Sequence, residues 1–169
     1  IWVPVLAQES KKEATEPISN SQETVPESNR TSLDLYVTPQ QAFDMWKANP
    51  NRVHIIDVRT FEEYVFVGHA PMARNIPIVF PKFENPATQV NPPKGKVPPG
   101  CSGVLNVDFV SSVKANYKEN DTILVMCVSG GRAAIAVNLL AKAGFIYVYN
   151  IVNGLEGDLV TDEGSAYYG

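Results

Sequence analysis

The most informative run in this chain of 169 residues is Ile123-Leu124-Val125-Met126-Cys127-Val128-Ser129-Gly130-Gly131-Arg132. Four apolar residues, a short glycine-bearing segment and the apolar run 133–143 are typical of a buried strand, a tight loop and a helix. The loop has a thiol at its first position and an arginine at its last. Because a helix N-terminus carries partial positive charge and successive N–H groups bind anions, the pattern predicts an anion site around Cys127.

Cys127 itself admits two interpretations. A single cysteine at a strand end is often a structural residue that packs as a small apolar side chain. However, the two glycines, the helix that follows and the guanidinium of Arg132 are features that stabilise a thiolate. They favour a reactive thiol, and we therefore predict that Cys127 is a nucleophile.

The composition excludes several classes of protein. The net charge is −4 and there is no basic stripe, so nucleic acid is not an expected partner. With two cysteines, Cys101 and Cys127, the chain is not a disulfide scaffold, and the usual zinc, metalloprotease and c-type haem spacings are absent. We expect no metal and no cofactor. No run reaches the roughly 20 apolar residues of a membrane span, so no transmembrane span is expected.

The composition also changes along the chain. Residues 1–32 begin with an apolar run and continue with Glu, Ser, Asn, Thr and Pro, so we interpret them as the remnant of an export signal and a disordered tether. This predicts an exported protein of the bacterial periplasm or the extracellular space; an arbitrary apolar N-terminus is the alternative. The folded domain is expected over 33–160, with a proline-rich insertion loop at 80–106. Residues 161–169 are interpreted as a tail.

The order of the elements predicts an α/β fold. Apolar strands at 53–58, 123–126 and 147–152 lack the polar alternation of exposed strands, and helical patterns separate them. Thr38 and Thr60 each begin a helix with a capping box. Such strands form a mainly parallel sheet with helices on both faces.

Two strand ends of this sheet carry chemically active residues. Asp57 and Arg59 come at the end of one strand, and Cys127 follows the last residue of another. Ligands of such sheets bind at the carboxyl ends of the strands. We therefore expect these side chains to face the same crevice.

Three motifs, in order along the chain, resemble those of the rhodanese-like sulfurtransferase family. They are Ile55-Ile56-Asp57-Val58-Arg59 with Glu62-Glu63-Tyr64, then Gly68-His69-Ala70-Pro71-Met72-Ala73-Arg74-Asn75-Ile76-Pro77, and the loop from Cys127 to Arg132. The likeness extends over about residues 34–158. It implies a rhodanese-like fold with a five-stranded, mainly parallel sheet flanked by helices. It also implies that Cys127 takes a sulfane sulfur from thiosulfate or a persulfide or polysulfide donor and passes it, as a persulfide, to a thiophilic acceptor.

The resemblance also implies roles for individual residues. Cys127 and Arg132 are the expected catalytic residues, and Asp57 and Arg59 are expected to support the loop as an ion pair or a capping acid. The partners implied are small sulfur-containing anions and protein or low-molecular-weight thiols. The substrate-binding residues are expected to be those of the loop, namely Val128, Ser129, Gly130, Gly131 and Arg132.

Some positions depart from the family pattern or are given only local roles. The segment 153–158 lacks a tryptophan that the family often has, Ala133 stands where serine is frequent, and Val128 replaces a charged residue of thiosulfate-using members. Because Val128 leaves Arg132 as the one certain cation of the loop, a persulfide or polysulfide is a better expected donor than thiosulfate. Glu63 is interpreted only as a helix cap, and His69 only as a turn residue with a local hydrogen bond.

Other functions compete with sulfur transfer. The main alternative is a noncatalytic rhodanese-like sulfur carrier or partner-binding module, although the presence of Cys127 and Arg132 argues against an inert one. A phosphatase or arsenate reductase is a minor alternative, because four residues separate Cys127 from Arg132, one fewer than in Cys-dependent phosphatases. In a redox role, Cys101 would form a disulfide with Cys127. Cys101 is otherwise an inert thiol or pairs with another molecule.

Overall fold

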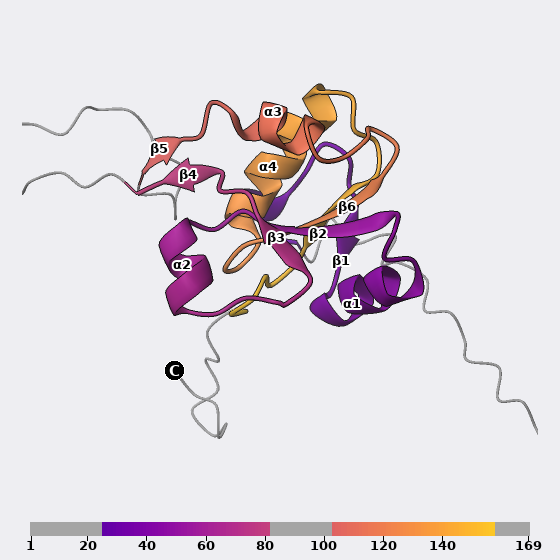
Figure 1. The fold of residues 1–169 in the computed structure, drawn as a ribbon, viewed down its shortest axis with the longest axis horizontal. Coiled ribbons are helices and arrows are strands. Elements are labelled where there is room, and N and C mark those ends of the chain that lie inside the picture. Colours follow the sequence, from indigo (N-terminus) through magenta and orange to yellow (C-terminus); the bar gives the residue numbers. More distant parts are fainter. Residues whose placement is uncertain (1–24, 82–102, 158–169) are drawn as a thin grey trace, which may run out of the picture.

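The computed structural model describes residues 25–81 and 103–157. The strands β1, β7, β6, β2 and β3, in that order, form a parallel sheet, and β4 and β5 form an antiparallel pair. The prediction of an α/β fold with a five-stranded, mainly parallel sheet is therefore confirmed (Figure 1). The elements are η1 (Glu27–Asn29), β1 (Tyr36–Val37), α1 (Pro39–Ala48), β2 (Val53–Asp57), α2 (Phe61–Phe66), β3 (Ala73–Asn75), β4 (Val79–Phe80), β5 (Val104–Leu105), α3 (Phe109–Lys114), β6 (Thr122–Met126), α4 (Gly131–Lys142) and β7 (Val148–Ile151).

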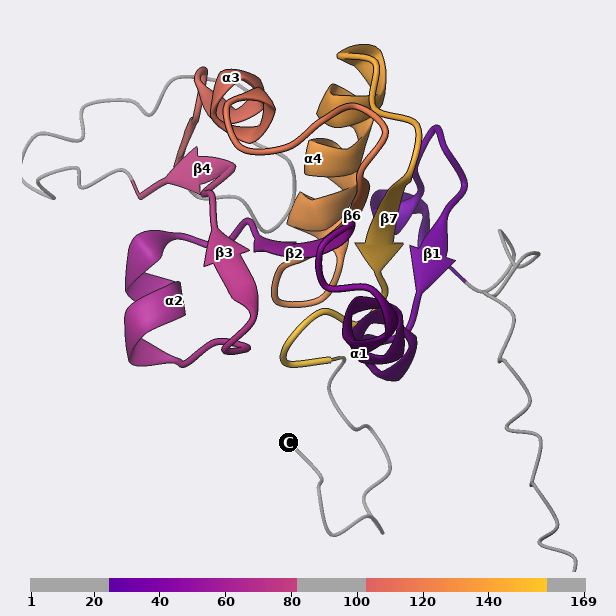
Figure 2. The same ribbon diagram turned by 45° about the vertical axis from the view of Figure 1, so that its right-hand side comes forward.

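Helices cover both faces of the sheet, and each face has its own core. On one face, α3 and α4 pack against the strands; on the other face, α1 does so (Figures 1 and 2). The alternation of side chains along β6 divides that strand between the two cores, because successive residues of a strand point to opposite faces. Val125 and Cys127 belong to the core beneath α3 and α4, whereas Leu124 and Met126 belong to the core beneath α1.

The two predicted capping boxes are confirmed. In α1, the Thr38 hydroxyl accepts from Gln41 N, and the Gln41 side chain accepts from Thr38 N at 2.8 Å. In α2, the Thr60 hydroxyl accepts from Glu63 N, and the Glu63 carboxylate accepts from Thr60 N at 2.9 Å. Each box satisfies two backbone donors that a helix start leaves unpaired, so these two helices begin where the sequence predicts.

The structure corrects the expectation for the end of the predicted tether. Residues 25–32 are not a disordered tether, because η1 packs against α4 and Val25, Asn29 and Thr31 are buried. The amide of Thr31 donates to the Tyr36 hydroxyl at 2.8 Å, which ties this segment to the first strand. A polar composition misled the prediction here, since the segment is held by hydrogen bonds rather than by a large apolar face.

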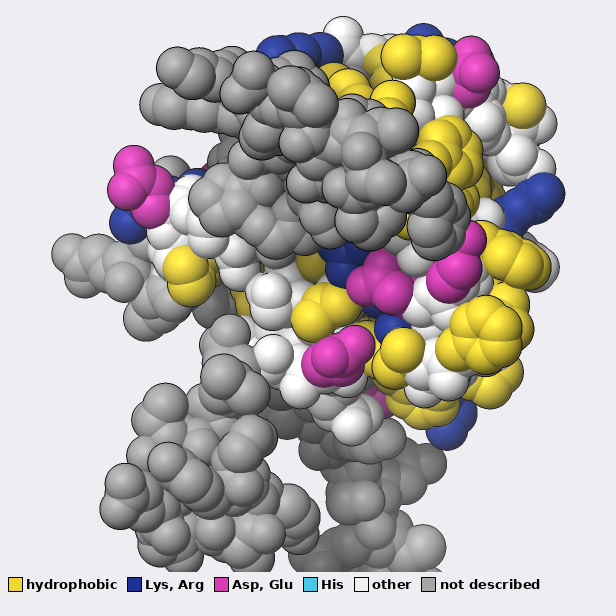
Figure 3. Space-filling model, turned by 90° about the vertical axis from the view of Figure 1, so that its left-hand side faces the viewer, with side chains coloured by type: hydrophobic (Ala, Val, Ile, Leu, Met, Phe, Trp, Pro, Cys, Tyr) yellow, Lys and Arg dark blue, Asp and Glu magenta, His cyan; other side chains and the backbone are white. Residues whose placement is uncertain are grey.

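The predicted insertion loop lies largely outside the described residues. Residues 82–102, which include Cys101, are not described, so the alternatives for that thiol remain predictions. The two ends of the loop meet in the ladder of β4 and β5, where Phe80 pairs with Val104. These two strands and α2 lie on the same side of the molecule, and Figure 3 shows several apolar patches there with acidic and basic groups between them. No described helix is long and apolar enough to span a membrane.

Candidate active site

Cys127 follows the last residue of β6 and is almost fully buried, with 1% of its surface exposed. β6 lies between β2 and β7 in the sheet, and Met126 pairs with Asp57 of β2. The thiol therefore lies at the carboxyl edge of the sheet. Its Sγ atom accepts a hydrogen bond of 3.1 Å from the backbone N–H of Gly130. A donor at this position stabilises negative charge on the sulfur.

Gly130 turns the chain from the loop into α4. Its φ angle of +103° lies in the left-handed region that favours glycine, and it is the N-cap residue of that helix. The first N–H groups of α4 have no acceptor within the helix and carry its partial positive charge. A Cβ atom on Gly130 would lie 2.9 Å from Nδ2 of Asn29. The loop thus leads directly into the N-terminus of α4, and Asn29 packs closely against the loop at Gly130.

The segment after β7 holds the first two carbonyl groups of the loop. Leu155 N donates to Cys127 O at 2.8 Å, and Glu156 N donates to Val128 O at 3.1 Å. Gly154 has a φ angle of +51°, and a Cβ atom there would overlap both of those carbonyl oxygens. Residues 154–156 therefore lie directly against the loop and form one wall of the candidate site.

Two asparagines hold the next two carbonyl groups. Asn29 Nδ2 donates to Ser129 O at 2.8 Å, and Asn150 Nδ2 donates to Gly130 O at 3.2 Å. Sequence reasoning missed both asparagines. Asn150 did give a signal, because a polar residue inside an apolar strand must find hydrogen-bond partners. As a result, four consecutive carbonyl groups, from Cys127 to Gly130, each accept a hydrogen bond from outside the loop.

Arg132, at the end of the loop, is bound to Glu63. Arg132 Nη1 and Nη2 donate to the two carboxylate oxygens of Glu63, each at 2.6 Å. The interaction is bidentate and largely buried, with 11% of the Arg132 side chain and 27% of the Glu63 side chain exposed. Sequence reasoning treated Glu63 only as a helix cap. The structure adds a second role, because the same carboxylate caps α2 and binds the arginine expected to act on substrate.

The surroundings of Glu63 strongly favour its charged form. Burial alone raises the pKa of this carboxyl group, but hydrogen bonds from Arg132 and from Thr60 N, together with the arginine charge, outweigh burial. The pKa of Glu63 is lowered from 4.5 to about 2. At neutral pH the carboxylate is therefore ionised and neutralises most of the arginine charge at the loop.

Asp57 and Arg59 form the expected ion pair at the end of β2, and both side chains are fully buried. Arg59 Nη2 lies 2.8 Å from Asp57 Oδ2 and also donates to Gly68 O at 2.7 Å. Within the described part of the chain, Arg59 Nη1 has no hydrogen-bond partner, and it lies 4.0 Å from the Glu156 carboxylate. The pair thus connects the strand end with the turn after α2 and approaches the wall of the site.

His69 lies in the turn that follows α2. Its Nδ1 atom is 2.9 Å from Tyr64 O, and its ring stacks on the Tyr64 ring with centroids 3.6 Å apart. The predicted local hydrogen bond is confirmed. In residues 25–81 and 103–157, no three His, Cys, Asp or Glu side chains gather in a way that could hold a metal ion.

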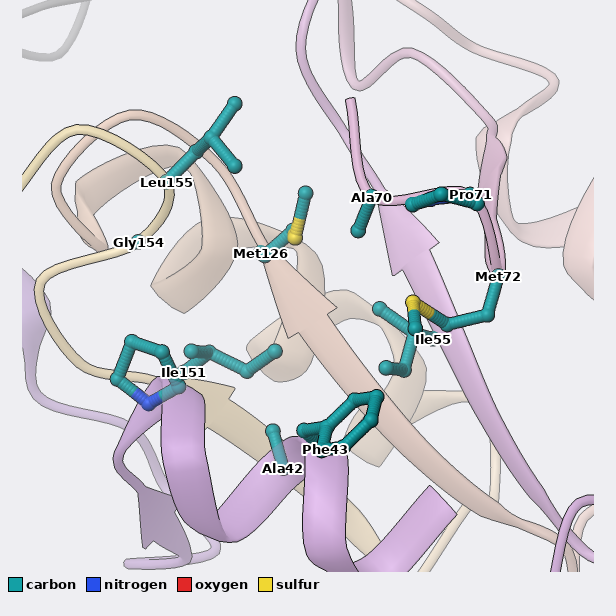
Figure 4. Close-up of a pocket in the computed structure, with 11 residues that line it drawn as sticks. Ala42, Phe43, Ile55, Ala70, Pro71, Met72, Met126, Ile151, Gly154 and Leu155 are labelled. Atoms are coloured by element: carbon teal, nitrogen blue, oxygen red, sulfur yellow. The ribbon is translucent and has the colours of Figure 1, made fainter. Parts of the chain in front are cut away.

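An apolar cavity of about 240 Å³ opens on the α1 side of the sheet. Phe43 of α1, Met72 and Met126 are among its lining residues, and Leu155 closes one end (Figure 4). Met126 faces the α1 core, whereas the Cys127 side chain belongs to the opposite core. The cavity is therefore next to the loop backbone but on the other face of the sheet from the thiol.

Comparison with known proteins gives a consistent family. Residues 39–158 match the family model described as Rhodanese-like domain. The chain is 37% identical over 100 residues to "Thiosulfate sulfurtransferase 16, chloroplastic" of Arabidopsis thaliana, and this match covers 59% of the chain and 68% of that protein. It is 29% identical over 120 residues to an uncharacterized protein of Rickettsia conorii, with 70% of this chain and 80% of that protein covered.

A solved structure shares the fold. The crystal structure of Rv0390 from M. tuberculosis superposes with a TM-score of 0.55 at 24% sequence identity. The superposition covers 73% of this chain and 81% of that one. The fold of this chain is thus that of a known architecture.

Proposed function

Because this chain belongs to the rhodanese-like domain family, we propose that it is a sulfurtransferase that carries sulfane sulfur as a persulfide on Cys127. The donor is thiosulfate or a persulfide or polysulfide, and the acceptor is a thiophilic nucleophile. A relative named as a thiosulfate sulfurtransferase supports this class of reaction. The observation that carries the proposal is the hydrogen bond from Gly130 N to Cys127 Sγ at the start of α4.

In the first half of the cycle, the Cys127 thiolate attacks the outer sulfur of the donor. A bond forms between Sγ and that sulfur, while the sulfur–sulfur bond of thiosulfate breaks and sulfite leaves with its electron pair. The N–H of Gly130 and the N-terminal N–H groups of α4 stabilise the anionic sulfur before and after the attack.

In the second half, the acceptor attacks the outer sulfur of the persulfide. The bond between this sulfur and Sγ breaks, and the electron pair returns to Sγ, which regenerates the thiolate. With cyanide as acceptor the product is thiocyanate, and with a thiol it is a new persulfide. Neither half requires a metal, a cofactor or an external oxidant, because the donor supplies sulfur that is already at the sulfane oxidation level, and the complete cycle returns Cys127 to the thiolate.

The ion pair of Arg132 with Glu63 bears on the choice of donor. Because Glu63 is ionised and holds the arginine with two short hydrogen bonds, little net positive charge remains at the end of the loop. Thiosulfate carries two negative charges, whereas a persulfide or a protonated polysulfide carries one. The reduced charge supports a singly charged donor, in agreement with the preference inferred from Val128.

Steady-state kinetics test the proposal. Parent protein, Cys127→Ser and Cys101→Ser are each supplied with thiosulfate or a glutathione persulfide donor and with cyanide, and thiocyanate is measured. We expect turnover in the parent and in Cys101→Ser, and none in Cys127→Ser. Turnover that survives in Cys127→Ser contradicts the proposal, and loss in Cys101→Ser indicates that the second thiol takes part.

A further inference from the structure

The segment 25–32 precedes the region that matches the family, yet it contacts the Cys127 loop. The family match covers residues 39–158, whereas η1 and its neighbours lie before it. The segment is fixed at two points, by the bond from Thr31 N to the Tyr36 hydroxyl and by a bond of 2.7 Å from Ser32 N to Asn138 Oδ1 on α4. It is therefore an ordered addition to the family region, held against the helix that follows the loop.

Asn29 is the residue of this segment that reaches the loop. Its Nδ2 donates to Ser129 O at 2.8 Å, and its Oδ1 accepts from the Ser28 hydroxyl at 3.0 Å. Its backbone carbonyl accepts from Asn150 Nδ2 at 3.0 Å. Hydrogen bonds at both Oδ1 and Nδ2 thus fix the orientation of the Asn29 side-chain amide, and Nδ2 is directed at the loop.

Asn150 completes the contact from inside the sheet. This residue of β7 is fully buried, and its Nδ2 donates both to Asn29 O and to Gly130 O. Its Oδ1 is buried without a hydrogen-bond partner among the described residues. Burial of an unpaired oxygen is unfavourable, so the position is poorly explained by stability alone. What Asn150 does provide is a bridge between the N-terminal segment and the loop.

The geometry of the peptide bond connects these contacts to the thiol. In a trans peptide the C=O and the following N–H lie in one plane and point in opposite directions. When Asn29 holds Ser129 O outward, the N–H of Gly130 must point inward, and it is this N–H that donates to Cys127 Sγ at 3.1 Å. Asn150 Nδ2 donates to the next carbonyl, Gly130 O, which also accepts the helical bond of 2.9 Å from Ala134 N, so Asn150 adds a second hydrogen bond at the start of α4.

We propose that Asn29 is a positioning residue for sulfur transfer, which acts through the Ser129–Gly130 peptide and is supported by Asn150. The proposal rests on the proposed function, since it concerns how the same thiol is kept reactive. It makes the segment 25–32 a part of the catalytic unit, although this segment lies outside the region that matches the family.

The test measures the reactivity of Cys127 without any sulfur donor. The rate of alkylation of Cys127 by iodoacetamide at pH 7 is followed by intact mass, in a Cys101→Ser background, for the full chain and for Asn29→Ala, Asn29→Asp and Asn116→Ala. We expect Asn29→Ala and Asn29→Asp to be alkylated about tenfold more slowly, the effect of a lost hydrogen bond to a charged sulfur. Asn116→Ala is the matched control, because Asn116 Nδ2 also donates to a backbone carbonyl, Ser112 O at 2.7 Å, but at an exposed position outside the loop. It is expected to react at the parent rate.

The two explanations of Asn29 give opposite results. If Asn29 only packed the loop, its loss would open access to a buried thiol, and alkylation would be unchanged or faster; either result overturns the proposal. Asn29→Asp covers the case in which Asn29→Ala fails to fold, because it keeps the size of the side chain and replaces the Nδ2 donor with a charged carboxylate oxygen that cannot bind Ser129 O.

Sulfur-transfer kinetics of the same variants give a second readout, in which kcat falls about tenfold and KM stays within about twofold. A fall in kcat/KM caused by KM alone contradicts a positioning role. If the parent transfers no sulfur, the proposed function fails while the alkylation result still decides the role of Asn29.

Discussion

Glu63 binds Arg132 through two hydrogen bonds of 2.6 Å, which join the first turn of α2 to the first turn of α4. The two residues are 69 positions apart in the sequence. The carboxylate lowers the net charge at the mouth of an anion-binding loop, and at the same time fixes the guanidinium in one orientation. From this relationship we expect Glu63 to influence which sulfur donor the site accepts.

Replacement of Glu63 tests this role in donor selection. Glu63→Gln keeps the capping box, because glutamine also accepts from the Thr60 amide, but removes the charge that neutralises Arg132. We expect KM for thiosulfate to fall about fivefold, since loss of the Glu63 charge leaves the loop more positive, and this attracts a dianion more strongly than a monoanion. The matched control is Glu62→Gln, an exposed neighbour on the same helix, for which KM should not change. An unchanged or higher KM in Glu63→Gln contradicts this role.

The same pair predicts how stability depends on pH. The pKa of Glu63 is about 2 in the folded protein and 4.5 for the unperturbed group. Because the folded-state pKa is lowered, the stabilisation is complete above about pH 5.5 and is lost as the pH falls through 4.5 towards 2. In urea denaturation, the parent should be more stable than Glu63→Gln at pH 7, and the difference should shrink at pH 2.5. A difference that stays constant with pH speaks against the ion pair.

The buried pair of Asp57 and Arg59 should matter more for stability than an exposed pair of equal length. In both this pair and the Lys114–Glu119 pair the nitrogen and oxygen atoms are 2.8 Å apart. Asp57→Asn leaves a buried guanidinium uncompensated, and we expect the free energy of unfolding to fall by about 3 kcal/mol or more. Glu119→Gln should cost less than about 1 kcal/mol, because that pair is solvated. Urea denaturation of both variants measures this, and equal losses contradict it.

Gly154 offers a test of the wall behind Cys127. Gly154→Ala places a Cβ against the carbonyl oxygens of Cys127 and Val128, so the segment must move and release the loop. We expect kcat for thiocyanate formation to fall at least about tenfold, because small displacements at a reacting atom have large effects on rate. Gly157→Ala is the control: it also has a positive φ angle, +76°, but the nearest atom lies 4.0 Å away.

The two glycine variants separate backbone strain from displacement of the loop. Both should lose about 1–2 kcal/mol of stability from the left-handed backbone alone. In addition, kcat for thiocyanate formation should fall in Gly154→Ala and should stay near the parent value in Gly157→Ala. Equal activity in both variants contradicts the role of the wall.

Much of the fold could be predicted from local sequence signals. The caps at Thr38 and Thr60 are formed by residues three positions apart, and the consecutive apolar residues within β2 and β6 indicate burial on both faces. The limits of elements were less predictable. The strand expected at 53–58 ends one residue earlier, as Val53–Asp57, and the strand expected at 147–152 is shorter at both ends, Val148–Ile151.

The parts of the site that escaped prediction depend on contacts distant in sequence. Asn29 meets Ser129 across 100 positions, and Glu63 meets Arg132 across 69 positions. Neither contact has a local spacing that would reveal it, and a single polar residue in a polar segment carries no signal of burial. Asn150 is different, because its position in an apolar strand already indicated a partner.

Intact mass spectrometry shows whether Cys127 carries the transferred sulfur. Reduced parent protein and Cys127→Ser are incubated with thiosulfate or polysulfide, measured, and then treated with cyanide. We expect the parent alone to gain the mass of one sulfur atom, and cyanide to remove this atom with release of thiocyanate. Absence of any added sulfur in the parent, or an equal gain in Cys127→Ser, contradicts this expectation.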